Sequence, residues 1–276
     1  MRANNLVLAC MLILSSLFWG ACSDDDDNHD FPGGTSAKLL PVKIEIDGTP
    51  DQYTFQYDKN NRLIKQEYTY KDENYYSSWH ISYDLDGKIV EMVKKASNTD
   101  TDTYTFTYEG NTITAVSKFY IELYEIDSEG KILKQTMQMK DTGEEAFQVE
   151  YKYDESGNIS ETMNKQGSRE TTQITHAYDK NNGVFKSVNT PQWFFCTQLS
   201  LYKMFHNNVT SIQSTPIYDG LRLSDASLPS ETTISYKYNA NAYPIRYSVT
   251  IPPSWCGTPP VGDATNHYTV RYQEAN

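Results

Sequence analysis

Basic residues, histidines and catalytic motifs are scarce in this chain of 276 residues, and each scarcity excludes a class of function. The 24 Lys and Arg stand against 36 Asp and Glu, which gives a formal net charge of −12. Nucleic acids and polyanionic glycans are bound by clusters of Lys and Arg, which this sequence does not contain, so we expect no nucleic-acid partner. The five histidines lie far apart, and no H-E-x-x-H, C-x-x-C, G-x-S-x-G or phosphate-loop motif occurs. We therefore expect no enzyme, no cofactor and no metal site.

Cysteine is also scarce, with four residues in the chain. Cys10 lies in an N-terminal apolar segment and Cys22 directly follows it, which leaves Cys196 and Cys256 in the main part of the chain. These two residues could form one disulfide, which would close a loop of about 60 residues and contribute roughly 4 kcal/mol in the chain-entropy model. Two separate buried thiols are the equal alternative.

The chain has one long apolar run, Leu6–Trp19, which lies between Arg2 and the small pair Gly20-Ala21. A run of about 14 residues is too short to cross a membrane as a helix and is typical of a secretory signal peptide. We therefore assign residues 1–21 to a signal peptide. The cysteine at position 22 predicts a lipoprotein whose first mature residue, Cys22, is acylated; a plain signal peptide is the alternative. Residues 22–38 begin with an acidic block and predict an extended tether.

A short sequence word recurs about every 25 residues along most of the remaining chain, and such a period indicates a repeat architecture. Its copies are YDKNNR from Tyr57, YDLDGK from Tyr83, IDSEGK from Ile126, YDESGN from Tyr153 and YDKNNG from Tyr178, with a shorter YEGNT from Tyr108 and a weaker YNANAY from Tyr238.

The word resembles both the start of a calcium loop and a hairpin turn. The fourth residue counted from the Asp is Asn61, Gly87, Gly130, Gly157 or Asn182. Glycine has no side chain that could bind a metal, but Gly and Asn share a tolerance of positive φ. A calcium loop of the EF-hand type needs its Gly at the sixth position, whereas a type I turn starts with Asp and accepts a left-handed residue afterwards. The word therefore predicts turns.

The segments that enter these turns have aromatic or apolar residues at alternate positions, as in Tyr53-Phe55-Tyr57 and Trp79-Ile81-Tyr83. Alternation with a period of two indicates strands with one buried face. Successive hairpins predict an all-β fold, an antiparallel meander of about 14–16 strands that forms a curved sheet or a barrel. Residues 39–276 are expected to be one repeat domain, with an insertion at 185–230.

The insertion contains the segment QWFFCTQLSLYKMF, which starts at Gln192 and is apolar on most sides. A helix with this pattern requires burial. We predict one helix near 191–206, with Thr190 as its N-cap, either across the concave face of the sheet or as a plug in one opening. The 22 tyrosines predict packing on a thin sheet or, more sharply, an aromatic platform for a ligand. The candidate ligand-binding aromatics are Trp79, Trp193 and Trp255.

With Cys22 and its acidic block, the Tyr-Asp-x-x-Gly/Asn hairpins and the segment YDKNNGVFKSVNTPQWFF, the chain resembles an uncharacterised family of Bacteroidetes-type surface lipoproteins. That family is described as a domain of unknown function with a porin-like fold, and the hairpins are also similar to YD/Rhs repeats. The resemblance implies a meandering sheet that closes into a barrel, and an outer-membrane location with the protein facing the cell exterior. It brings no catalytic residues.

Charged residues in the middle of many strands, such as Lys65, Glu67, Lys134 and Glu150, disagree with the apolar outer band of a membrane barrel. We therefore expect a soluble barrel that is attached to the membrane through the N-terminal lipid. Its expected role is non-catalytic binding, the capture of a glycan or a peptide. A structural or protein-interaction component of the outer envelope is the first alternative. A glycan-active enzyme is the second, because paired carboxylates on neighbouring strands leave no sequence motif.

Overall fold

The computed structural model describes residues 37–70, 75–97, 99–166, 170–199, 204–218, 221–222, 230–252 and 264–276, so the expected signal peptide and most of the tether lie outside the described residues. The described part is all-β with one short helical segment. Its strands are β1 (Leu39–Ile46), β2 (Gln52–Tyr57), β3 (Leu63–Tyr70), β4 (Tyr75–Tyr83), β5 (Ile89–Ala96), β6 (Thr99–Glu109), β7 (Thr112–Val116), β8 (Tyr120–Ile126), β9 (Ile132–Met139), β10 (Glu145–Tyr153), β11 (Ile159–Gln166), β12 (Glu170–Tyr178), β13 (Val209–Tyr218), β14 (Leu221–Arg222), β15 (Ser230–Tyr238), β16 (Pro244–Ile251) and β17 (Ala264–Glu274).

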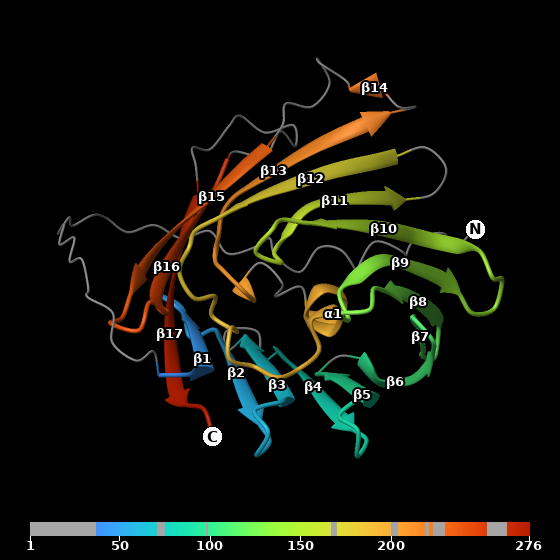
Figure 1. The fold of residues 1–276 in the computed structure, drawn as a ribbon, viewed down its shortest axis with the longest axis horizontal. Helices are drawn as coiled ribbons and strands as arrows, with labels where there is room; N and C mark the ends of the chain where they lie inside the picture. Colours follow the sequence, from blue (N-terminus) through green and yellow to red (C-terminus); the bar gives the residue numbers. More distant parts are fainter. Residues whose placement is uncertain are drawn as a thin grey trace. The chain divides into compact units, whose positions relative to one another are not determined.

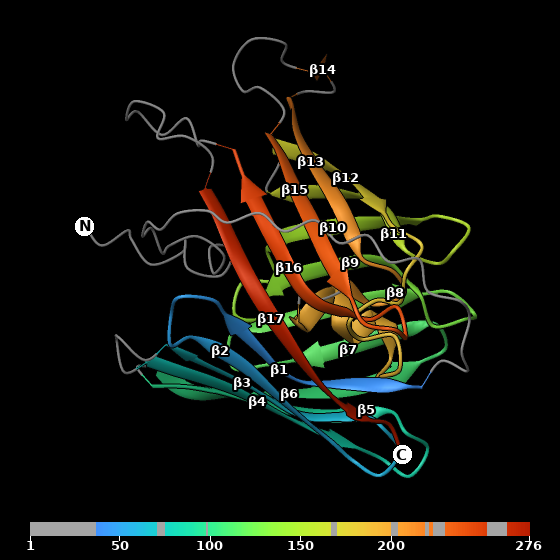
Figure 2. The same cartoon turned by 90° about the vertical axis from the view of Figure 1, so that its left-hand side faces the viewer.

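The sheet closes into a barrel because its first and last strands pair. Leu39 lies opposite Glu274 and Ile44 opposite Val270, while Ile44 also lies opposite Tyr53 of β2. Every other strand of the ring pairs antiparallel with the next one, and only β14 stands aside, paired with β13 alone. Figures 1 and 2 show this ring of 16 strands from two directions. The predicted antiparallel meander of about 14–16 strands is confirmed, and of the two predicted forms, a curved sheet or a barrel, the structure has the barrel.

The recurring Asp residues make turns, as the sequence predicts. In the β10–β11 hairpin the Asp154 carboxylate accepts the backbone N–H groups of Ser156 and Asn158, both at 2.9 Å. Asp58, Asp127 and Asn239 accept two N–H groups in the same pattern. The φ angle is 84° at Gly87, 81° at Gly130, 83° at Gly157 and 61° at Asn61, and even the weaker copy has Ala242 at 58°. We call this end of the barrel the Asp-turn end and the opposite end the loop end.

The turn that starts at Asp179 differs from the prediction. Asn182 does not take a positive φ, and the chain instead leaves the wall here and returns 26 residues later. Asn208 then completes the turn: the Asp179 N–H donates to the Asn208 carbonyl at 3.0 Å, and the Asn208 N–H donates to the Asp179 carboxylate at 3.1 Å. The inserted segment is therefore spliced into an Asp turn without opening the ring, because β12 and β13 still pair directly.

The inserted segment fills the barrel interior near the Asp-turn end (Figures 1 and 2). We call residues 183–199 and 204–206 the plug. Its described helical part is an α-helical turn, α1 (Gln192–Phe194), that continues into a π-helical turn, Phe195–Leu199, and residues 200–203 of the predicted helix near 191–206 lie outside the described residues. The predicted N-cap is wrong, because Pro191 takes the N-cap position and the Thr190 hydroxyl instead accepts the Leu63 N–H at 2.8 Å. Within the described ranges, no helix is long and apolar enough to cross a membrane.

Large side chains of the plug form the centre of the hydrophobic core. Phe185, Phe194 and Phe195 are fully buried, and the Phe185 ring centroid lies 5.3 Å from that of Phe55 on β2. A barrel of this many strands is wider than its own side chains can fill. The plug therefore supplies the core that the wall alone cannot form at this end.

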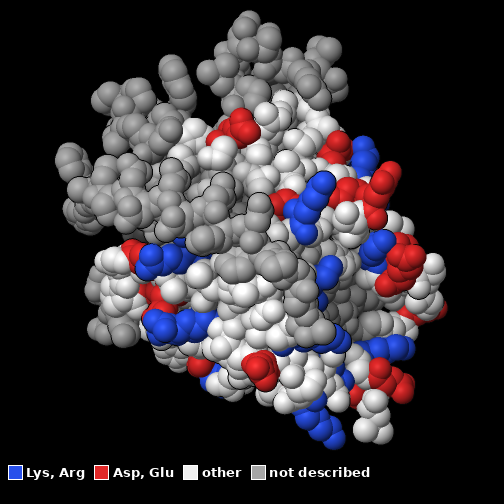
Figure 3. All heavy atoms as spheres, turned by 60° about the vertical axis from the view of Figure 1, so that its left-hand side comes forward, with Lys and Arg blue, Asp and Glu red and all other residues white. Residues whose placement is uncertain are grey.

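The outer face of the wall carries charged residues that pair across neighbouring strands. Lys152 and Glu161 are 2.7 Å apart, Lys165 and Glu150 are 2.8 Å apart, and Arg271 lies 2.6 Å from Glu45. Figure 3 shows Lys and Arg next to Asp and Glu on one face of the molecule. Exposed ion pairs of this kind add little stability, but they are typical of a sheet face that contacts water.

Candidate functional site

The inner face of the wall is identified by the side chains that contact the plug. Phe55, Phe106 and Tyr124 pack against plug aromatics, with ring centroids 5.3, 5.7 and 5.2 Å from those of Phe185, Trp193 and Trp193. Because side chains alternate along a strand, and opposite residues in an antiparallel pair share a face, the register gives the other inward residues. By this rule Tyr53 and Tyr68 point inward on β2 and β3.

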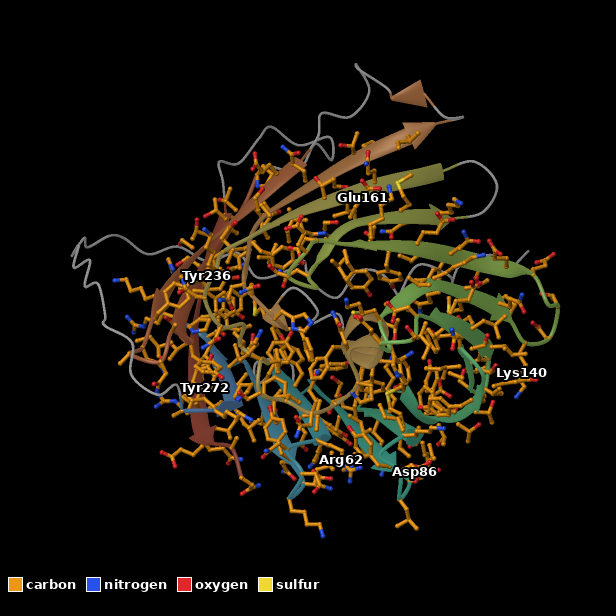
Figure 4. All side chains as sticks on the ribbon, viewed as in Figure 1. Arg62, Asp86, Lys140, Glu161, Tyr236 and Tyr272 are labelled. Atoms are coloured by element: carbon orange, nitrogen blue, oxygen red, sulfur yellow. The ribbon has the colours of Figure 1, made fainter. Side chains whose placement is uncertain are left out.

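One set of inward tyrosines belongs to the Asp-turn end, and each of its members donates its hydroxyl to a backbone carbonyl of the preceding strand. We call this set the tyrosine ladder. The bonds are Tyr57 to Pro41, Tyr83 to Leu63, Tyr108 to Ile89, Tyr153 to Ile132, Tyr178 to Ile159, Tyr236 to Val209 and Tyr272 to Pro244, with lengths of 2.7 to 3.0 Å. Figure 4 labels Tyr236 and Tyr272, together with Arg62 and Asp86 at the Asp turns.

The ladder explains why the recurring word begins with tyrosine. Its ring covers the core beside the plug while its hydroxyl satisfies a carbonyl near the end of a strand. Burial raises the pKa of Tyr57 and of Tyr153, so both stay protonated donors at any physiological pH. The ladder tyrosines are therefore structural.

A second set of inward tyrosines lies further from the Asp turns, and its hydroxyls are not used by the wall. Tyr53 and Tyr68 have ring centroids 4.6 Å apart, and Tyr247 and Tyr268 stack at 4.5 Å with an interplanar angle of 6°. We call these four residues the loop-end cluster. Their strands are neighbours through β1. No residue in the described part of the chain accepts or donates a hydrogen bond at their four hydroxyls. Burial of the ring raises the pKa of Tyr53 to about 12.

Trp79 continues this aromatic wall on β4. Its indole ring is half-buried, and it lies opposite Gln66, which itself lies opposite Phe55. Lys94 of β5 lies opposite Trp79 and places its ammonium 4.7 Å from the centre of the indole ring. Burial lowers the pKa of Lys94, and the carboxylates of Glu122 and Asp102 oppose that shift.

Glu122 connects this wall to the plug through a buried hydrogen-bond network. Its carboxylate accepts the Tyr124 hydroxyl at 2.6 Å, the Gln135 amide at 2.9 Å and the Gln198 amide of the plug at 3.3 Å. Gln198 also donates to the Tyr124 hydroxyl at 2.6 Å, and Tyr151 donates to Gln135. Burial raises the pKa of Glu122, while the hydrogen bonds from Tyr124 and Gln135 act in the opposite direction. The network fixes the position of the plug in the barrel.

Gln66 contributes an unused acceptor to the same region. The residue is 8% exposed, and its Oε1 atom is buried without a hydrogen-bond partner among the described residues. Gln66 lies opposite Phe55 of β2, which packs against the plug, and opposite Trp79 of β4. Buried acceptors without partners are rare in folded proteins, and a water molecule or a ligand is a common explanation.

The structure separates the predicted site residues. Trp79 lies on the inner wall, opposite Gln66 of β3, and its role in ligand binding stays a prediction. Trp193 is 3% exposed and packs against Phe106 and Phe194, so its interpretation as a ligand-binding residue is corrected to a plug-core residue. Cys196 is a buried thiol of the plug, and burial raises its pKa. Cys22, Trp255 and Cys256 lie outside the described residues, so the lipid anchor and the disulfide stay predictions.

Sequence reasoning missed Tyr53, Tyr68, Tyr247 and Tyr268 as a group, and it also missed Lys94 and Gln66. The period-two pattern does identify which of these residues share a face within one strand. It does not tell which of the 22 tyrosines face the plug and which lie beyond it. Among the described residues, no group of three or more His, Cys, Asp or Glu is placed to hold a metal ion.

Comparisons with known proteins give structural neighbours of low similarity. No protein-family model matches the sequence, and no curated protein matches it. A porin-like protein from Bacteroides uniformis is 11% identical, with a TM-score of 0.39, over 84% of this chain and 96% of that chain. A porin-like protein from Bacteroides vulgatus is 12% identical, with a TM-score of 0.40, over 85% and 99%. A Tc holotoxin pore from Photorhabdus luminescens has a TM-score of 0.27 and 11% identity over 71% of this chain and 11% of that chain. Scores this low transfer no property to this chain.

Proposed function

We propose that this chain is a cell-surface lipoprotein that captures a neutral glycan in the loop-end half of its barrel, without changing it chemically. The observation that carries the proposal is the contrast between the two sets of inward tyrosines. Ladder hydroxyls are bonded to the wall, whereas the hydroxyls of the loop-end cluster have no partner among the described residues. Unused donors beside stacked rings suit a ligand that offers both apolar and hydroxyl surface.

A sugar ring has this mixed character. Its C–H face packs on an aromatic ring such as Trp79 or Tyr68, and its hydroxyl groups pair with the phenol hydroxyls of the loop-end cluster. Most inward positions of the described strands are aromatic, aliphatic or neutral polar, and the charges of Lys94 and Glu122 lie close together. An uncharged ligand therefore fits the wall better than an ionic one.

The proposed location is the outer membrane, with the protein facing the cell exterior and held there by lipid on Cys22. The support comes from the sequence: an apolar run of about 14 residues, a small pair before the cysteine and an acidic block after it. The charged outer face of the barrel agrees with a wall that contacts water instead of lipid. A Cys22→Ala variant should lose membrane attachment, and recovery of that variant in the membrane fraction would contradict the anchor.

The binding proposal is tested with a glycan array, followed by titration of each neutral oligosaccharide that binds while tryptophan fluorescence is recorded. We expect a saturable fluorescence change, because Trp79 is half-buried on the proposed wall. Replacing Trp79 with Ala should weaken binding at least tenfold, which corresponds to about 1.4 kcal/mol.

A matched control lies on the same strand. Tyr76 is 48% exposed and, by alternation, points to the outer face of β4, so Tyr76→Ala should leave the affinity unchanged. If no neutral glycan binds saturably, or if both variants lose affinity equally, the proposal fails. A peptide or protein ligand recovered in its place would favour the alternative role as an interaction component.

A further inference from the structure

The tyrosine ladder has one gap, at the end of β8. The recurring word begins there with Ile126 in place of tyrosine, and no ladder bond is formed at this position. At three turns a cation that follows the left-handed turn residue covers the ladder tyrosine of the next hairpin: Arg62 over Tyr83 at 4.4 Å, Lys88 over Tyr108 at 5.2 Å and Lys131 over Tyr153 at 5.8 Å. The turn at Gly157 has no such cation, because Asn158 follows it, but Tyr178 still supplies the ring there. At the gap, Asn111 follows Gly110 and the strand ends in Ile126, so this position has neither the cation nor the ring.

A pocket of about 330 Å³ opens at the gap. The turn glycines Gly87, Gly110 and Gly130 form its rim, and Tyr108 and Ile126 line it from the wall. The first residues of the helical segment, including Trp193, line it from the plug. Asp86, Lys88 and Glu129 also line the pocket, so it has charged side chains as well as Tyr108 and Trp193 around it. It lies at the opposite end of the barrel from the proposed glycan site.

We propose that this pocket binds a single tyrosine side chain supplied by a partner protein. Each of the seven ladder positions holds a tyrosine ring of the chain itself that donates to a strand carbonyl at the Asp-turn end, and the gap is the position where the chain does not supply one. The half-buried Tyr108 can pack against an added ring as the ladder rings pack against their neighbours, while Trp193, which is 3% exposed, closes the pocket on the plug side. The partner ring would restore the missing member of the ladder.

The probe for this site is N-acetyl-L-tyrosinamide, added to the ¹⁵N-labelled barrel while amide shifts are recorded by NMR. We expect saturable shifts at Gly87, Gly110 and Gly130, with a dissociation constant on the order of millimolar for so small a ligand. N-acetyl-L-alaninamide is the matched control and should give no saturable shift. Shifts confined to the amides of β2, β3, β16 and β17 would place the ring at the loop-end cluster and overturn the proposal.

The Ile126→Tyr variant tests whether a tyrosine ring of the chain itself can occupy the pocket. In Ile126→Tyr the new ring should occupy the pocket, so the glycine shifts should fall at least tenfold and the denaturation midpoint should rise. Equal shifts in this variant, or no saturable shift in the wild-type protein, would overturn the proposal. If the variant does not fold, the wild-type titration alone decides. Because the readout is local to the rim, the outcome is independent of whether the barrel binds a glycan.

Discussion

The two ends of the barrel use tyrosine in opposite ways. At the Asp-turn end, seven tyrosines surround the plug and give their hydroxyls to strand carbonyls. Further toward the loop end, Tyr53, Tyr68, Tyr247 and Tyr268 pack on one another while their hydroxyls have no partner among the described residues. The same residue type therefore stabilises the fold in one half and offers a binding surface in the other, and the hydroxyl partner distinguishes the two roles.

The largest difference in stability should be between variants of two tryptophans, one in the plug and one on the inner wall toward the loop end. Trp193 is 3% exposed in the plug core, so Trp193→Ala should lower the free energy of unfolding by about 3–5 kcal/mol. Trp79 is half-buried on the inner wall, and Trp79→Ala should lower the free energy of unfolding by about 1 kcal/mol. Urea denaturation measures both values. Equal losses would mean that the wall around Trp79 is as structural as the plug.

Substitution of Gly183, where the chain enters the plug, tests how tightly the two segments of the plug, residues 183–199 and 204–206, pack against each other. A Cβ atom at Gly183 would lie 2.6 Å from the carbonyl oxygens of Met204 and Phe205, which are backbone atoms and cannot rotate away. Gly183→Ala should therefore cost about 2–3 kcal/mol in urea denaturation. A loss under about 0.5 kcal/mol would show that the plug is loosely held.

Two Tyr→Phe variants test the role of the tyrosine hydroxyl alone, one in the ladder and one in the loop-end cluster. Tyr153→Phe removes the donor to the Ile132 carbonyl and should lower the free energy of unfolding by about 1 kcal/mol. Tyr268→Phe removes a hydroxyl that has no partner in the described part of the chain, so stability should change by less than about 0.5 kcal/mol. Thermal or urea unfolding of the pair measures the difference. The reverse order of losses would contradict the division into two sets.

The smallest effect should be the contribution of the plug residue His206 to the pH dependence of stability. Burial lowers the pKa of His206 from 6.5 to about 4, and its Nε2 atom is buried without a partner among the described residues. Between these values the unfolded chain binds the proton and the folded chain does not, so stability should fall as the pH drops from about 6.5 toward 4. Because the ring is partly exposed, we expect a loss on the order of 1 kcal/mol.

His206→Gln should flatten this part of the stability profile. His267→Gln, on the exposed side of β17, is the control and should leave it unchanged. An unchanged profile in His206→Gln would assign the pH dependence to other groups.

The hairpins could be predicted from the sequence because their causes are local. An Asp followed three residues later by Gly or Asn favours a turn, as at Asp58 and Asp154 although not at Asp179, and alternation determines which side chains share a face. The copies at Asp58, Asp127 and Asp154 therefore match the prediction residue by residue. The number of strands follows from the number of turns.

Features that depend on distant residues could not be predicted in the same way. The closure of the barrel needs Leu39 beside Glu274, and the insertion of the plug between β12 and β13 needs Asp179 beside Asn208. Neither pairing has a local sequence pattern. The form of the plug, an α-helical turn that continues into a π-helical turn, could not be read from its apolar composition, because the surrounding wall buries any apolar segment whatever its helix type. The same argument explains Trp193, whose apolar neighbours indicate burial but not a ligand.

The most direct test of the two roles of tyrosine is ring NMR of the ¹³C-tyrosine-labelled protein during titration with neutral oligosaccharides such as maltohexaose, cellohexaose and xylohexaose. A glycan bound in the loop-end half should shift the ring signals of Tyr53, Tyr68, Tyr247 and Tyr268 saturably, while those of Tyr57, Tyr153 and Tyr178 stay in place. Shifts of the ladder tyrosines with the loop-end cluster unchanged, or no saturable shift with any of these sugars, would contradict the account.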